Sequence, residues 1–357
     1  MRAGIAGAGL LGRLLACQLV DAGWQVTLFD SDEMDGHASC AMAAAGMLAA
    51  VAELERAETA IYPLAQLSLL LWPKILAQLP TKIFFRQQGS LVTAHPGDQN
   101  LLTHYLAQIT AKLTAPGLYQ PLTATQLQQL EPELTKFSEG YYFPHEAQLD
   151  NQQLLQALAD YLLTKNVSWH SNSFVNHVKP HEIILTDQIH QFDMAFDCRG
   201  LGAQSNWPAL RGVRGELIWL QAPEVNITRP VRLLHPRYSL YVVPRPNSIY
   251  LIGASEIESS DKSELSVRSA LELLSAAFSV HSGFAEARII KTAVNCRPAL
   301  SDNLPKISYC AGFMAINGLY RHGFLIAPAL LNCVQQFLTN KTIDFPDLFV
   351  EKTHANH

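Results

Sequence analysis

The first thirty residues carry the feature that most limits the possible fold. Residues 2–30, RAGIAGAGLLGRLLACQLVDAGWQVTLFD, have the pattern of a buried strand, a glycine-rich turn, a helix and a second strand. The spacing of Gly7, Gly9 and Gly12 lets the backbone turn tightly, approach a pyrophosphate and pack the helix against the strand. The segment therefore predicts a βαβ unit that binds a dinucleotide at a helix N-terminus, the alternative being a turn that serves helix packing alone.

Asp30 supports the dinucleotide prediction. It ends the second strand, eighteen positions after Gly12. A carboxylate at this place can accept hydrogen bonds from ribose hydroxyls and would repel a 2′-phosphate. The later pattern does not continue as regular βα units, which a nicotinamide dehydrogenase normally has, so the sequence favours FAD.

Length and charge narrow the class of partner. With 357 residues, the chain is long enough for two domains, or for one domain with a large insertion. The net charge is −5 and no basic run is present, which argues against nucleic acid or an anionic membrane surface as partner. We therefore expect a small-molecule partner.

The cysteines predict neither a metal site nor disulfides. All six are scattered, without CxxC pairs, which suits reduced thiols in a cytoplasmic protein. The N-terminal segment resembles a signal peptide, but we interpret it as the first strand and helix. No uninterrupted apolar stretch of about 18 residues is present, so we expect no membrane span.

The remaining pattern predicts a discontinuous fold of α/β class, α+β overall. Strand-like and helical segments after residue 82 leave the βαβ rhythm, and long strands joined by tight turns follow residue 211, which indicates an antiparallel sheet. We predict a Rossmann-like FAD-binding domain from residues 1–82, 146–212 and 291–357. A substrate domain with a mixed or antiparallel sheet is predicted from residues 83–145 and 213–290.

Five further motifs, read together with the glycine turn, resemble a known family. They are AAAGML (43–48), RGVRGE (211–216), YVVPR (241–245), RPALSDNLPKI (297–307) and GLYRHGFLIAPA (318–329). In order and spacing they are similar to the D-amino-acid-oxidase superfamily, and most closely to the thiamine-pathway glycine oxidases. The resemblance implies a two-domain flavoprotein whose amino-acid substrate lies between the flavin and an antiparallel sheet.

The resemblance also implies the substrate site. Arg297 matches the arginine that grips the substrate carboxylate, a task that suits the bidentate guanidinium, and Tyr241 matches a tyrosine that assists it. Arg321 matches a second arginine near substrate and flavin, and these three residues form the predicted catalytic set. Met47 and Glu256 complete the predicted substrate contacts.

Two positions depart from the pattern of the relatives. Ser239 stands where the best-studied glycine oxidases have a histidine, and Glu256 stands where they have a methionine. Glu256 could favour an amino or secondary-amine group, restrict substrate size, or be a solvated carboxylate at a strand end. We read the charged residues of RGVRGE chiefly as a structural network, with direct ligand contact as the alternative.

The cofactor implied by the resemblance is non-covalent FAD. The predicted cofactor-binding residues are Gly7, Gly9, Leu10, Leu11, Gly12, Asp30, Ser31, Ser39, Ala45, Gly46, Met47, Val175, Gly200, Arg297, Leu319, Tyr320, Arg321, His322, Gly323, Phe324 and Leu325.

Arg321 and His322 precede an apolar run that predicts a helix from Phe324. Positive side chains at a helix start oppose the helix dipole, so they indicate an anion nearby. We expect this anion to be the reduced flavin, stabilised by the helix N-terminus and by Arg321. The alternative is that both side chains reach solvent, and we assign no catalytic role to His322.

The resemblance implies FAD-dependent oxidative deamination of glycine, or of a similar small amino acid or secondary amine. The product is an imine that hydrolyses to an oxo acid, and O2 becomes H2O2, in the context of thiamine thiazole biosynthesis. The alternatives are a dehydrogenase of D-amino acids or secondary amines with another electron acceptor, and a flavin-binding partner protein without turnover. The expected partners are the amine and O2, with no metal, and a homo-oligomer is compatible with the sequence.

Overall fold

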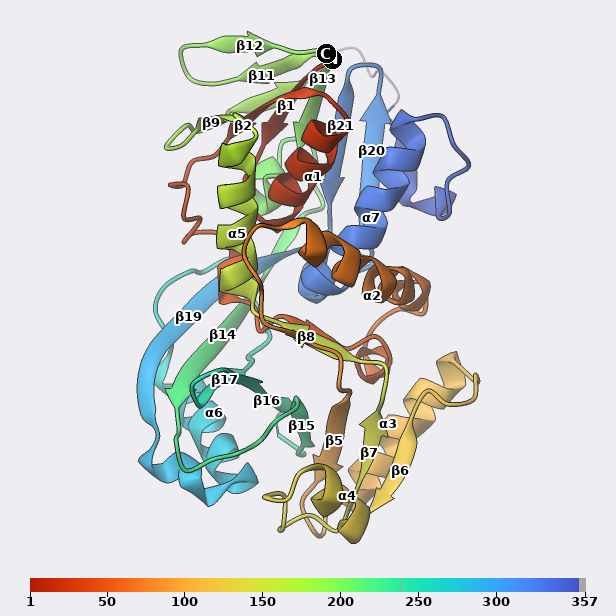
Figure 1. Cartoon of the computed structure of the whole chain (residues 1–357), viewed down its shortest axis with the longest axis vertical. Coiled ribbons are helices and arrows are strands. Elements are labelled where there is room, and N and C mark those ends of the chain that lie inside the picture. Colours follow the sequence, from red (N-terminus) through yellow and green to blue (C-terminus); the bar gives the residue numbers. More distant parts are fainter. Residues whose placement is uncertain (238, 353–357) are drawn as a thin grey trace.

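A seven-stranded sheet forms the upper part of the molecule in Figure 1. This computed structural model describes residues 1–237 and 239–352, without the side chain of Ser239. The strands lie in the order β22, β20, β21, β13, β1, β2, β9. They span β1 (Arg2–Ala6), β2 (Gln25–Phe29), β9 (Ser168–His170), β13 (Met194–Asp197), β20 (Lys306–Cys310), β21 (Phe313–Asn317) and β22 (Phe349–Glu351). All neighbours are parallel except β20 and β21, which confirms the predicted α/β class.

Helices cover one face of this sheet and a small sheet covers the other. The helices are α1 (Leu10–Asp21), α2 (Ile61–Gln78), α5 (Asn151–Thr164) and α7 (Gly323–Leu338). The small antiparallel sheet consists of β10 (His177–Lys179), β11 (Glu182–Ile184) and β12 (Ile189–Gln191). The alternation of strand residues explains both layers, since Ile5 packs into the helical core and its neighbour Ala6 packs on the opposite side.

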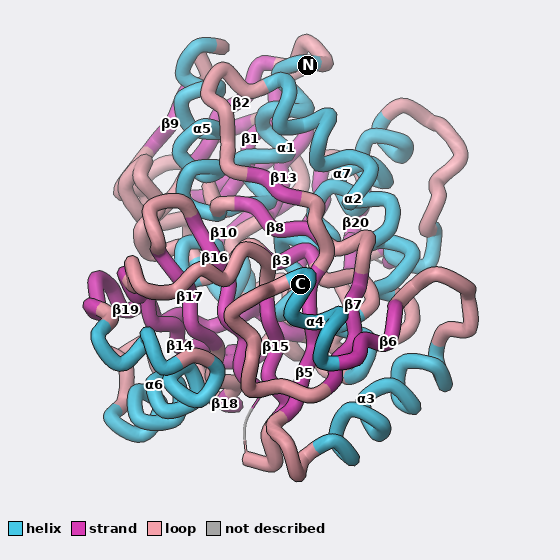
Figure 2. Tube along the Cα trace, turned by 60° about the horizontal axis from the view of Figure 1, so that its bottom comes forward, coloured by secondary structure: helices cyan, strands magenta, loops and turns pink. Residues whose placement is uncertain are grey.

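A nine-stranded sheet forms the lower part of the molecule (Figures 1 and 2). It contains β5 (Ser90–Ala94), β6 (Gln120–Thr123), β7 (Glu139–Phe143), β14 (Arg211–Gln221), β15 (Val231–Leu234), β16 (Ser239–Arg245), β17 (Ile249–Gly253), β18 (Ile257–Glu258) and β19 (Arg288–Ala299). The helices of this part are α3 (Gln99–Lys112), α4 (Ala124–Leu130) and α6 (Val267–Val280). A short sheet of β3 (Met47–Leu48), β8 (Ala147–Leu149) and β4 (Phe85–Arg86) lies between the upper and lower parts.

The faces of the large sheet differ in what they contact. Val242 and Ile252 pack into the core that α6 covers. Tyr241 and Leu251, their neighbours in sequence, lie on the opposite face with Ala45. Because successive side chains of a strand point to opposite faces, the register fixes Tyr241 on the side that faces the residue 45–47 segment.

Two segments differ from their sequence patterns, which predict one strand over residues 83–94 and a helix from about Ser263 to Phe278. Residues 83–94 form not one strand but two, β4 and β5, in different sheets. The break lies at Gly89, which has φ +72° and where a Cβ would overlap the Tyr142 ring. The helix expected from about residue 263 begins at Val267, because Ser266 caps it by accepting a hydrogen bond from the Ser269 amide.

The two longest strands connect the upper and lower parts. β14 and β19 pair with each other over most of their lengths, and Figure 1 shows both running from the large sheet toward the seven-stranded sheet. The predicted domain boundaries at 212/213 and 290/291 fall inside these strands. The division of the chain into domains stays a prediction.

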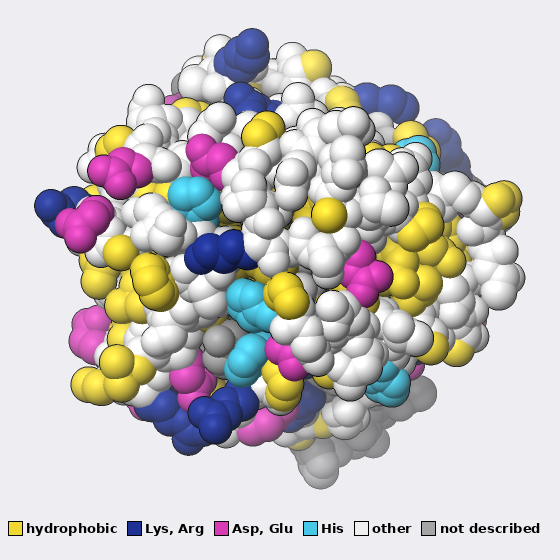
Figure 3. Space-filling view, turned by 90° about the horizontal axis from the view of Figure 1, so that it is seen from below, with side chains coloured by type: hydrophobic (Ala, Val, Ile, Leu, Met, Phe, Trp, Pro, Cys, Tyr) yellow, Lys and Arg dark blue, Asp and Glu magenta, His cyan; other side chains and the backbone are white. Residues whose placement is uncertain are grey.

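The face of the molecule seen from below carries charged side chains of both signs (Figure 3). At the lower end, Lys and Arg side chains are interspersed with Asp and Glu (Figure 3). Within residues 1–237 and 239–352, no helix is both long and apolar enough to cross a membrane.

Candidate active site

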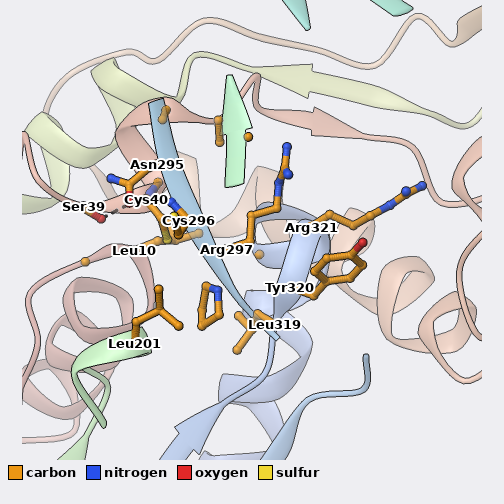
Figure 4. Close-up of a pocket in the computed structure, with 18 of the residues that line it drawn as sticks. Leu10, Ser39, Cys40, Leu201, Asn295, Cys296, Arg297, Leu319, Tyr320 and Arg321 are labelled. Atoms are coloured by element: carbon orange, nitrogen blue, oxygen red, sulfur yellow. Dashed lines mark hydrogen bonds between the residues drawn. The ribbon is translucent and has the colours of Figure 1, made fainter. Parts of the chain in front are cut away.

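One cavity of about 840 Å³ lies where the two large sheets meet. Its lining includes the glycine turn after β1, the segment of residues 38–49, and residues 319–325 before and within α7. In Figure 4, Leu10 and Leu201 lie on one side, Tyr320 and Arg321 on the other, and Arg297 between them. Every predicted site residue lines this cavity except Gly12. Segments almost three hundred positions apart in the chain therefore share one site.

The glycine turn has the geometry of an anion cradle. Gly7 has φ +94°, and a Cβ there would lie 2.6 Å from the backbone of Cys198. Gly9 is the N-cap of α1 and provides no side-chain hydrogen bond, so first-turn amides of the helix remain available. Gly12 serves helix packing instead, because a Cβ there would overlap the carbonyl oxygen of Gly7.

Asp30 lines the cavity and also braces the turn. Its carboxylate accepts hydrogen bonds from the Ala8 amide and, at 2.9 Å, from the Asp32 amide. Asp30 therefore fixes the position of the turn, in addition to the ribose contact expected from the sequence.

Replacing Gly12 with valine should abolish cofactor binding. The new side chain would push α1 away from Gly7 and so disrupt the turn. We expect purified Gly12→Val to lack bound dinucleotide and to unfold at a lower temperature. Ala22→Val, at the exposed far end of α1, is the control. Full cofactor content in Gly12→Val would contradict this assignment.

Arg297 and Tyr241 come together on the cavity side of the large sheet. The Arg297 guanidinium donates long hydrogen bonds of 3.3–3.4 Å to the carbonyl oxygens of Ser255 and Arg214. Among the described residues it forms no ion pair with a carboxylate. Burial raises the pKa of Tyr241 to about 12, so its hydroxyl stays protonated and can donate. An unpaired guanidinium beside a phenol hydroxyl suits a carboxylate ligand.

Two glycines make room for these side chains. A Cβ at Gly215 would overlap the Arg297 guanidinium, and a Cβ at Gly253 would lie 2.6 Å from the Tyr241 ring. Gly253 is the direct cross-strand partner of Tyr241. Both side chains therefore lie flat on a sheet surface from which larger residues are excluded.

Arg321 has carboxylate partners inside the protein. It forms ion pairs with Glu53 and with Glu256, the second at 3.3 Å. In Figure 4 its side chain diverges from that of Arg297. Two protein carboxylates therefore compensate much of the charge of Arg321, and its expected contact with the reduced flavin stays a prediction.

Glu53 is the centre of this ion-pair network. It follows β3 in a short 3-10 helix, Ala52–Glu55, and binds both Arg232 and Arg321. Burial alone would raise the pKa of Glu53, but the two guanidinium groups outweigh burial and hold the pKa well below its usual range. Glu146 fixes the same segment by accepting hydrogen bonds from the Val51 and Ala52 amides at 3.0 and 2.7 Å.

His322 is buried, not solvent-exposed. Burial, followed by the charge of Arg321, lowers its pKa to about 4, so the imidazole is neutral at neutral pH. Its Nδ1 atom is buried without a hydrogen-bond partner among the described residues. A buried ring nitrogen without a partner, in a cavity wall, is a candidate contact for a bound polar group.

A buried, neutral His322 should make folding sensitive to acid. In the unfolded chain a histidine titrates near 6.5, so the contribution of His322 to stability is present above that pH and is lost as the pH falls toward 4. We expect the free energy of unfolding to fall by up to about 3 kcal/mol between pH 7 and pH 4 through this group. Urea titrations of His322→Gln should lack this component, whereas the exposed control His104→Gln should keep it.

The other predicted positions have mixed outcomes. In the motif RGVRGE, Arg214 pairs with Glu216 at 2.8 Å and Arg211 pairs with Glu258 at 2.6 Å. Of this motif, only Gly215 lines the cavity, which supports the interpretation of its charged residues as a structural network. The side chain of Ser239 lies outside the described residues. Within the described chain, no group of His, Cys, Asp and Glu could hold a metal ion.

Several residues of the site were not predicted from the sequence. Glu53, Arg56, Gly215 and Arg232 are among those that line the cavity, and Gly253 lies against the Tyr241 ring. Glu53 and Arg232 carried no distinct signal, because each stands near other charged residues in the sequence. The glycines carried none, since the clash that they avoid depends on strand register.

The cavity fits an elongated dinucleotide. The glycine turn and the α1 N-terminus suit a diphosphate at one end, and residues 319–325, with the unpartnered His322 nitrogen, form a wall at the other. Arg297 and Tyr241 leave a carboxylate site beside that wall.

Comparisons with known proteins agree with this geometry. A family model described as FAD dependent oxidoreductase matches residues 2–331. A putative thiamine biosynthesis oxidoreductase, ThiO, from Rhizobium etli is 36% identical over 335 residues, which cover 92% of this chain and 94% of that protein.

Two solved structures share the fold over nearly the full chain. Glycine oxidase from Geobacillus kaustophilus has a TM-score of 0.86 at 22% identity, covering 100% of both chains. Iminodiacetate oxidase from Chelativorans sp. BNC1 has a TM-score of 0.83 at 22% identity, covering 98% of this chain and 99% of that chain. The match over almost the whole length, together with the glycine turn and the cavity that it opens, shows that the chain belongs to the FAD dependent oxidoreductase family.

Proposed function

We propose that this protein oxidises glycine, or a similar small amino acid or secondary amine, to an imine that water hydrolyses to an oxo acid. The observation that carries the proposal is Arg297, a guanidinium in the cavity wall that has no carboxylate partner within the described chain and lies beside the protonated hydroxyl of Tyr241. A substrate carboxylate supplies the missing anion. The names of two structural relatives, glycine oxidase and iminodiacetate oxidase, agree with an amine substrate that bears a carboxylate.

Arg297 and Tyr241 orient the substrate from the sheet side of the cavity. The fork of the guanidinium binds both carboxylate oxygens and the phenol donates a third hydrogen bond, which fixes the rotation of the substrate about its carboxylate. The glycine turn and residues 319–325 would hold FAD, which when bound would supply the redox chemistry, a two-electron oxidation of the amine with O2 as acceptor and H2O2 as product. The protein then contributes mainly alignment, because a carboxylate held at two points presents its α-carbon in one orientation.

The ionisable groups around the site are poor proton acceptors at neutral pH. His322 has a pKa of about 4, and the pKa of Glu53 is held well below its usual range by two arginines. Proton transfer by either side chain is therefore unfavourable. The substrate amine releases its proton to solvent before oxidation.

Gly253→Ala should weaken substrate binding without touching the substrate. The added methyl group would displace the Tyr241 ring, which lies against the glycine. Loss of a hydrogen bond to a charged group costs about 1.5–3 kcal/mol, so we expect KM to rise about tenfold or more while kcat changes less. Tyr241→Phe should give a similar KM, and the two changes combined should not add. An unchanged KM in Gly253→Ala would contradict this role.

The identity of the electron acceptor is the main alternative. A dehydrogenase of the same fold would pass electrons to another acceptor, and its reduced flavin would persist in air. Stopped-flow mixing of reduced protein with O2 separates the two functions. We expect rapid reoxidation with release of peroxide, and a screen of glycine, sarcosine, D-alanine and D-proline should rank the substrates.

The remaining predictions concern context. The name of the Rhizobium etli relative supports a role in thiamine biosynthesis, and a role in making its thiazole stays a prediction. A cytoplasmic location and a homo-oligomeric state stay predictions.

A further inference from the structure

Glu256 neutralises two arginines at the edge of the cavity. Its carboxylate accepts a hydrogen bond from the Tyr320 hydroxyl and lies 3.3 Å from Arg321 and 3.7 Å from Arg56. The side chain is 38% exposed, so it stands at the solvent side of the cavity lining. Burial alone would raise its pKa, but the Tyr320 hydrogen bond and the neighbouring arginines outweigh burial and lower it. Glu256 is therefore ionised at neutral pH.

The local charges are balanced only while Glu256 is present. The ion-pair network contains three guanidinium groups, those of Arg56, Arg232 and Arg321. Its three carboxylates belong to Glu53, Glu55 and Glu256. Arg56 and Arg321 each form an ion pair with Glu256. Arg56 also pairs with Glu55, and Arg321 also pairs with Glu53. Removing the charge of Glu256 leaves a net positive charge on two side chains that line the cavity.

Glu256 lies close to the proposed carboxylate site. The residue before it, Ser255, accepts a hydrogen bond from the Arg297 guanidinium through its carbonyl oxygen, at 3.3 Å. A substrate whose first carboxylate is bound to Arg297 extends its side chain or N-substituent within reach of the Glu256 carboxylate. A second anionic group there would meet a fixed negative charge, because two hydrogen bonds and an ion pair with Arg56 hold Glu256 in place.

We propose that Glu256 determines substrate specificity by excluding amines that carry a second anionic group, and so restricts the site to monocarboxylic substrates. This inference rests on the proposed function. It predicts that Glu256→Gln opens the site to dicarboxylic amines, because the positive charge that Glu256 no longer compensates on Arg56 and Arg321 can then attract the second carboxylate. Glutamine keeps the size of the side chain and still accepts the Tyr320 hydrogen bond.

The test compares ligands that differ by one carboxylate. Acetate and malonate are titrated into the purified holoenzyme, and binding is followed by the change in flavin absorbance. We expect Glu256→Gln to shift the ratio of dissociation constants toward malonate by about tenfold or more, with acetate affinity changed less than threefold. The matched control is Glu258→Gln, two residues on, whose carboxylate pairs with Arg211 away from the cavity and should leave the ratio within about twofold of wild type.

Turnover gives the second readout. The ratio of kcat/KM for iminodiacetate to that for sarcosine should rise by a similar factor in Glu256→Gln and stay unchanged in Glu258→Gln. Wild-type protein offers an independent check that needs no variant, because its discrimination against malonate should weaken as salt rises from 0.05 to about 0.5 M.

The outcomes are distinguishable. An unchanged malonate-to-acetate ratio in a folded, flavin-loaded Glu256→Gln, or a wild-type discrimination that ignores salt, would overturn the inference. Equal weakening of both ligands would also overturn it, since Glu256 would then act only by supporting the site. A wild-type protein that binds acetate but oxidises no amine would instead remove the proposed function and leave the charge selection intact.

Discussion

Arg297→Ala is expected to raise KM for every amino-acid substrate by at least about a hundredfold. The guanidinium lines the cavity without a carboxylate partner within the described chain, so its full charge is available to the substrate. Loss of a bidentate, charge-assisted contact costs roughly 3 kcal/mol, which corresponds to two orders of magnitude in affinity. Steady-state kinetics and titration with acetate should report the same loss.

The lysine variant and a second arginine serve as controls. Arg297→Lys keeps the charge but not the fork, so its KM should lie between those of wild type and Arg297→Ala. Arg288→Ala, at the exposed start of the same strand, should leave KM unchanged. A wild-type KM in Arg297→Ala would remove this residue from the substrate site.

Glu53→Ala is expected to destabilise the protein by about 3–5 kcal/mol. Glu53 is the shared partner of Arg232 and Arg321, whose side chains are only 7% and 14% exposed. Without the carboxylate, two largely buried positive charges face each other, and breaking a buried pair by removing one partner carries a cost of this size. Urea unfolding of wild type and variant, both loaded with FAD, measures the difference.

The damage from Glu53→Ala should be specific to the network. Glu58→Gln, an exposed carboxylate five residues further on, should change stability by less than about 0.5 kcal/mol. Adding Arg321→Met to Glu53→Ala should restore part of the lost stability, because one of the two positive charges that Glu53 compensated is then gone. Equal unfolding midpoints for Glu53→Ala and wild type would show that the network does not stabilise the fold.

The sequence predicted the site best where the residues that form it lie close together in the chain. The glycine turn, Asp30 and the α1 helix lie within thirty residues, and their spacing alone predicts the strand, turn and helix that the structure contains. Gly7 and Gly12 have the backbone geometry and close contacts that such a turn requires. The antiparallel sheet was likewise predicted from local alternation and turn residues.

The sequence was least informative about the partners of charged residues. Arg321 and His322 indicated a nearby anion, but not that Arg321 pairs with Glu53, 268 positions earlier in the chain, and with Glu256. No local pattern predicts an ion pair across such a separation. The same limit applies to Gly253, which leaves room for the Tyr241 ring only because the register of β16 and β17 places the two residues opposite each other.

The central claim is that the glycine turn and the residue 319–325 segment bind one FAD, beside which Arg297 holds the carboxylate of an amine substrate. Anaerobic titration of the purified protein with glycine and sarcosine, followed by visible absorbance, tests it most directly. We predict a yellow protein whose flavin is bleached by the amine and recovers its colour on admission of air, with one peroxide per amine consumed. A protein without bound flavin, or a flavin spectrum that no small amino acid or secondary amine changes, would contradict the account.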